Sequence, residues 1–73
     1  MSIAYLIGLV DKRTGTIKRV FVCSDEMPTT NWDVWPVIIA QVKAATYGEA
    51  AQRLRDWALR ELDWIKPFVK GEL

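Results

Sequence analysis

Two strand-like stretches lie near the N-terminus, separated by a short polar segment. Residues Ser2 to Val10 and Thr16 to Cys23 are rich in the aliphatic and aromatic residues that favour β-strands. Residues 11–15 between them are polar and end in Gly15, which adopts the left-handed backbone conformation more readily than other residues. The pattern predicts an antiparallel β-hairpin with a solvated, basic tip.

The last third of the chain has the spacing of an amphipathic helix. Thr46 and Glu49 are placed as a capping box, in which each side chain satisfies a backbone N–H at the helix start. Apolar residues then recur three or four apart as far as about Ile65, and Pro67 ends the pattern. The apolar face of this predicted helix consists of Ala50, Ala51, Leu54, Trp57, Ala58, Leu62 and Ile65.

Residues Val37 to Ala45 fit two patterns. In a strand, one face would carry Ile38, Ala40, Val42 and Ala44, with Gln41 and Lys43 on the other face. In a helix, one stripe would consist of Trp35, Ile38, Ile39, Val42 and Ala45. The β-branched run at residues 37–39 and the cap at Thr46 favour a strand followed by a helix.

These elements predict a small α+β fold in a single domain, residues 1–73. An antiparallel hairpin and a third strand would pack against one C-terminal helix, in the order β-β-β-α. The helical alternative for residues 37–45 would give β-β-α-α.

The first predicted strand is apolar on both faces, although one helix covers only one face of a sheet. Ile3, Tyr5, Ile7 and Leu9 alternate with Ala4, Leu6 and Val10. The second face therefore needs its own cover. The candidates are the Trp32/Trp35 loop, the Phe68 tail, a second copy in a homodimer, or a different partner.

The segment from Ser24 to Pro36 has no regular pattern, and it is predicted to be a long acidic loop. Its charges are Asp25, Glu26 and Asp33, and it carries the indoles of Trp32 and Trp35. Loops of this length are usually functional or held by their own side chains. An acidic rim around two indoles can meet a basic patch on another protein. The alternative is that the loop is only a solvated connection.

Composition narrows the function classes. The chain has a net charge of +1, one cysteine and no histidine, which excludes an internal disulfide and imidazole chemistry. The apolar run Ile3 to Val10 has no basic flank and is far shorter than the roughly 20 residues of a membrane span. We expect a cytoplasmic protein without a membrane segment, and neither an enzyme nor a metal or cofactor protein.

Three residue groups are candidate binding sites. The first is a helical stripe of Arg53, Trp57, Arg60 and Trp64, because Trp and Arg dominate interface hot spots; the alternative is that the indoles cap the core. The second is the loop group Trp32, Asp33 and Trp35. The third is the basic hairpin group Lys12, Arg13, Lys18 and Arg19, which could contact phosphates but has no interleaved aromatic residues in the sequence.

No phosphate loop, zinc spacing or nucleic-acid-binding signature occurs in the chain. A small histidine-free domain with surplus aromatic surface is better suited to binding a protein than to catalysis. In size and surface character it resembles the accessory proteins with which phages and mobile elements block a host defence complex by occluding its binding surface. The alternative is a nucleic-acid-binding or regulatory domain that uses the basic hairpin tip, although the low net charge makes nucleic acid the less favoured partner.

Overall fold

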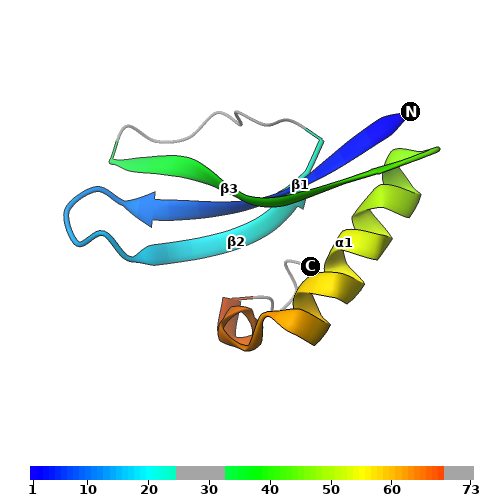
Figure 1. Ribbon diagram of the computed structural model, residues 1–73. Helices are drawn as coiled ribbons and strands as arrows, with labels where there is room; N and C mark the ends of the chain where they lie inside the picture. Colours follow the sequence, from blue (N-terminus) through cyan, green and yellow to red (C-terminus); the bar gives the residue numbers. More distant parts are fainter. Residues whose placement is uncertain (25–32, 69–73) are drawn as a thin grey trace.

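A computed structural model describes residues 1–24 and 33–68. Its elements are β1 (Ser2–Asp11), β2 (Ile17–Cys23), β3 (Val34–Ala44), α1 (Tyr47–Glu61) and a 3₁₀ helix, η1 (Asp63–Phe68). β1 is the central strand, antiparallel to both β2 and β3, and α1 lies across one face of this sheet (Figure 1). The predicted α+β fold and the order β-β-β-α are confirmed, and residues 37–44 form a strand.

The hairpin between β1 and β2 turns where Gly15 was expected to allow it. Gly15 has φ 72°, and its N–H donates to the carbonyl oxygen of Asp11 at 2.8 Å. The N–H of Asp11 donates in turn to the carbonyl oxygen of Thr16 at 2.8 Å. The register of β1 and β2 shifts between Leu9 and Val10, which leaves Lys18 as an extra residue in β2.

β3 begins three residues earlier than the pattern indicated. Val34, Trp35 and Pro36 were predicted to lie in a loop, but they pair with Asp11, Val10 and Leu9 of β1. An edge strand tolerates Pro36 because an N–H that faces away from the sheet has no ladder partner to lose. The rest of the predicted loop, residues 25–32, lies outside the described residues, Trp32 included.

A β-bulge at Ile39 divides β3 into two halves. The alternation of side chains between the two faces of the sheet is reversed from one half to the other. Leu6 pairs with Ala40 and Ile7 pairs with Ile38, so that Ile39 has no partner of its own. The expectation that Ile38 shares a face with Ala40, Val42 and Ala44 is therefore wrong, because an extra residue reverses the alternation of side chains. Ile39 lies over Gly8. A Cβ atom added at Gly8 would be 3.1 Å from the Cδ1 atom of Ile39.

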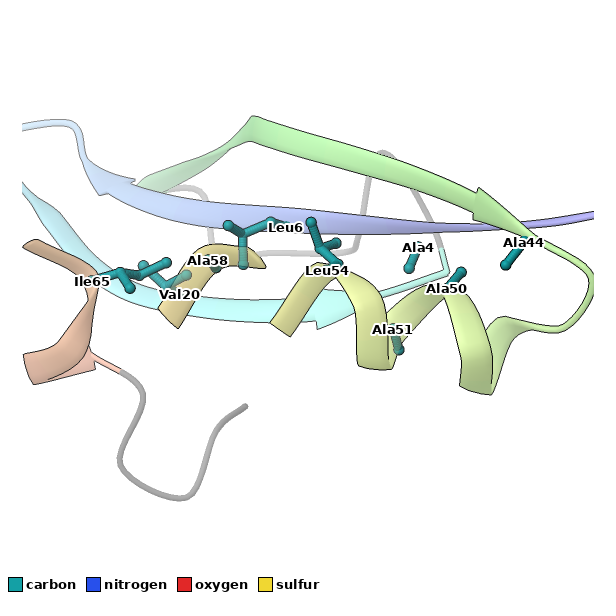
Figure 2. Close-up of a cluster of buried hydrophobic side chains, with 9 residues drawn as sticks. All are labelled: Ala4, Leu6, Val20, Ala44, Ala50, Ala51, Leu54, Ala58 and Ile65. Atoms are coloured by element: carbon teal, nitrogen blue, oxygen red, sulfur yellow. The ribbon is translucent and has the colours of Figure 1, made fainter. Parts of the chain in front are cut away.

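The helix α1 is capped by Thr46, which is one half of the predicted capping box, and it approaches the sheet through small residues. Thr46 is extended, with φ −127° and ψ 159°, and its Oγ1 accepts the N–H of Glu49 at 3.2 Å. Ala50, Ala51, Leu54 and Ala58 are buried on the face that meets the sheet. Figure 2 shows Ala4 and Leu6 of β1 against these residues. The alanines allow the helix to lie close to β1.

α1 ends at Glu61, four residues before the predicted end. Leu62 leaves the helical conformation with φ −115° and ψ 88°, and η1 follows with Pro67 inside it. The pattern could not separate the two elements because Leu62 and Ile65 continue the helical spacing. The break turns the chain so that Ile65, which is fully buried, joins Val20 of β2 in the core (Figure 2).

The sheet has one face against α1 and a second apolar face, as the sequence indicated. The second face includes Ile7, which is fully buried, and its cross-strand neighbours Phe21 and Ile38. Phe68 and Trp35, which belong to two of the expected covers, are placed elsewhere, and Trp32 lies outside the described residues. Phe68 packs against the α1 side of the sheet because η1 folds back there, and Trp35 is a β3 residue opposite Val10 on that same side.

We predict that Leu54→Ala lowers the free energy of unfolding by about 3 kcal/mol, because the fully buried side chain leaves a cavity between α1 and β1. Urea denaturation followed by circular dichroism measures this change. Leu59→Ala is the matched control on the same helix, and we expect it to change stability by less than ~0.5 kcal/mol because Leu59 is 40% exposed. Equal losses from the two variants would contradict this packing of α1.

Candidate functional site

The sheet extends beyond the helix that covers it. β3 has 11 residues, which corresponds to roughly 36 Å of strand, whereas the 15 residues of α1 correspond to roughly 22 Å. Figure 1 shows the hairpin tip and the start of β3 reaching away from α1. We call this part of the sheet, residues 10–18 and 34–38, the overhang.

Large apolar side chains are exposed along β3 in the overhang. Trp35 is 46% exposed, Val37 40% and Ile38 43%. We call these three residues the β3 apolar edge. Trp35 and Val37 lie on the α1 side of the sheet, opposite Val10 and Gly8, and Ile38 lies on the other face beside Ile7. The β3 apolar edge therefore presents contacts on both faces of one strand.

No strand in the described part of the chain pairs with the outer edge of β3. The two edges of the sheet differ in how they are protected. β2 has 7 residues and carries Lys18, Arg19 and a bulge, which are features that discourage further pairing. β3 is longer, and its only ionisable residue is Lys43. Pro36 and the bulge at Ile39 are its remaining protection.

Two basic residues of the hairpin lie over aromatic rings. The Lys12 Nζ atom is 5.9 Å from the ring centroid of Trp35, and the Arg19 guanidinium carbon is 5.9 Å from that of Phe21. Both separations are within the range of cation–π contacts. The tertiary structure thus supplies the aromatic neighbours that the sequence did not show for the basic group. The spacing of Arg19 and Phe21 was a usable signal, since residues two apart in a strand share a face.

The carboxylate of Asp11 lies among the basic residues of the hairpin. Its Oδ1 accepts the N–H of Arg13 at 2.7 Å, and its Oδ2 is 3.4 Å from the Nζ atom of Lys18. The Arg13 N–H first, and then Lys18, hold the pKa of Asp11 below its ordinary value of 3.8, although partial desolvation opposes them. An open hollow of about 380 Å³ beside this group is lined by Asp11, Lys12, Arg13, Lys18 and Asp33.

That hollow is poorly suited to anions. Three cations and two carboxylates line it, which leaves a net charge of +1 at neutral pH. Asp33 is exposed, and its carbonyl oxygen accepts the N–H of Lys12 at 3.1 Å. A phosphate bound there would meet two negative groups as well as the cations. The aromatic and apolar surface is the more distinctive feature of the overhang.

The four residues of the predicted helical stripe are divided between two elements. Arg53 and Trp57 lie in α1, where Arg53 pairs with Glu49 at 2.7 Å and Trp57 packs partly buried against the core. Arg60 contacts Glu61 at 3.3 Å. Trp64 belongs to η1, is 44% exposed, and meets the ring of Phe68 edge-on at 6.3 Å. The end of α1 at Glu61 separates Trp64 from the others.

Glu61, the last residue of α1, is exposed and pairs with Arg60. No three His, Cys, Asp or Glu side chains are grouped as metal ligands within residues 1–24 and 33–68. In the same residues, no helix has the length and apolar character that crossing a bilayer requires.

We predict that Asp11 titrates below pH 3.8 in the folded protein. Its contribution to stability is then complete above the ordinary pKa and is lost as the pH falls through the lower folded value. A ¹³C NMR titration of the carboxyl carbon measures this directly. Lys18→Ala should leave part of the lowering, because the N–H of Arg13 still donates to the carboxylate. Titration at or above 3.8 in the wild-type chain would contradict the arrangement.

No protein-family model, curated protein or solved structure matches this chain at a significant level. Function is therefore inferred from the geometry described above.

Proposed function

We propose that this chain is a small non-catalytic protein-binding module that contacts its partner through the β3 apolar edge. The observation that supports this function is the exposure of Trp35, Val37 and Ile38 within four residues of one edge strand. Single exposed apolar residues are ordinary, but a contiguous group on a small domain is typical of an interaction surface.

The energy available from this edge can be bounded. Complete burial of a large apolar side chain contributes roughly 1.5–3 kcal/mol, and these three are somewhat less than half exposed. Their further burial is therefore worth about 3 kcal/mol in total, which is too little for a stable complex by itself. The partner must add other contacts, and the flanking Lys12 and Lys43 are available for them.

The mechanism proposed is occlusion: the bound domain covers a surface that its partner needs for another contact. The narrower proposal, a phage or mobile-element accessory protein that inhibits a host defence complex, rests on the size and the surface character of the chain alone. The domain would block its partner by binding through the β3 apolar edge. Of the three residues of that edge, Trp35 was already a candidate in the sequence analysis.

We predict that the double variant Trp35→Ala/Ile38→Ala releases the bound partner, because it removes the largest exposed apolar area from the edge. The measurement is affinity capture from nuclease-treated host lysate followed by mass spectrometry. Both side chains are nearly half exposed, so we expect the variant to remain folded by circular dichroism.

The matched control is Leu59→Ala/Trp64→Ala, which removes two side chains of similar exposure from α1 and η1. It should retain the partner. Loss of the partner in the control and not in the β3 variant would move the site to η1 and overturn the proposal. Trp57 is unsuitable as a probe because it packs against the core.

A second candidate function is single-stranded nucleic-acid binding at the hairpin. It is favoured by the two cation–aromatic pairs, Lys12 with Trp35 and Arg19 with Phe21. Basic residues beside aromatic rings are the usual elements of a surface on which bases stack and phosphates pair. The carboxylates of Asp11 and Asp33 in the same hollow weigh against it.

Under this second candidate, affinity for an oligothymidine must fall steeply with salt. Four phosphate contacts correspond to a slope of about −3 in a plot of log K against log salt, and each lost contact reduces it by about 0.7. Fluorescence anisotropy with a labelled oligothymidine gives the slope. Arg13→Ala should reduce it, whereas Arg53→Ala on α1 should not. Absence of binding at 50 mM salt would exclude this function.

A further inference from the structure

We draw no further inference here: the strongest candidate, the outer edge of β3 along residues 37–43, belongs to the site already described, and nothing in the described part of the structure shows what pairs with it.

Discussion

The packing of α1 on β1 is the constraint on which the rest of the molecule depends. Ala50, Ala51, Leu54 and Ala58 form the buried face of the helix, and Ala4 and Leu6 oppose them from the central strand. Three small residues allow the backbones to approach closely, but they bury little area each. A domain of 73 residues has little other core, so its stability is concentrated in this layer and in the contact between Ile65 and Val20.

A helix shorter than the strands that it covers leaves part of the sheet open. The strands continue past the last turn of α1, and η1 folds back toward β2 instead of extending over β3. Trp35 and Val37 therefore lie on the correct face for a core but beyond the reach of the helix. Their exposure lowers the stability of the isolated domain, and contact with a partner would offset that loss. The same geometry places the basic hairpin beside them.

Two β-bulges adapt the sheet to this arrangement. The bulge at Ile39 allows Ile39 and Ala40 to face the same side, where Ile39 lies above Gly8. It also turns Ile38 to the opposite face beside Ile7. The extra residue, Lys18, lies next to Asp11. The ion pair between them and the hydrogen bond from the N–H of Arg13 to Asp11 stabilise the end of the hairpin. Local irregularity thus determines which side chains reach the overhang.

The sequence by itself determined the hairpin, the start of the helix and the buried face of the helix. The hairpin turn at Gly15, the cap of Thr46 and the buried alanines of α1 follow from local spacing, because turns, caps and helical faces depend on residues a few positions apart. The alternation of apolar residues along β1 is also a local pattern, and it indicated that the sheet has a second apolar face. The sequence also identified Trp35 and the basic hairpin residues as candidates, but as separate groups.

Only the tertiary structure decided how those groups meet. The register of β3 on β1 brings Trp35 to Lys12 across more than twenty residues of chain, and the bulge at Ile39 sets the facing of Ile38. The end of α1 at Glu61 separated Trp64 from Trp57, although their spacing continues a helical pattern. Strand register, bulges and the folding back of η1 are governed by packing between distant segments, and a periodic pattern along one segment carries no information about them.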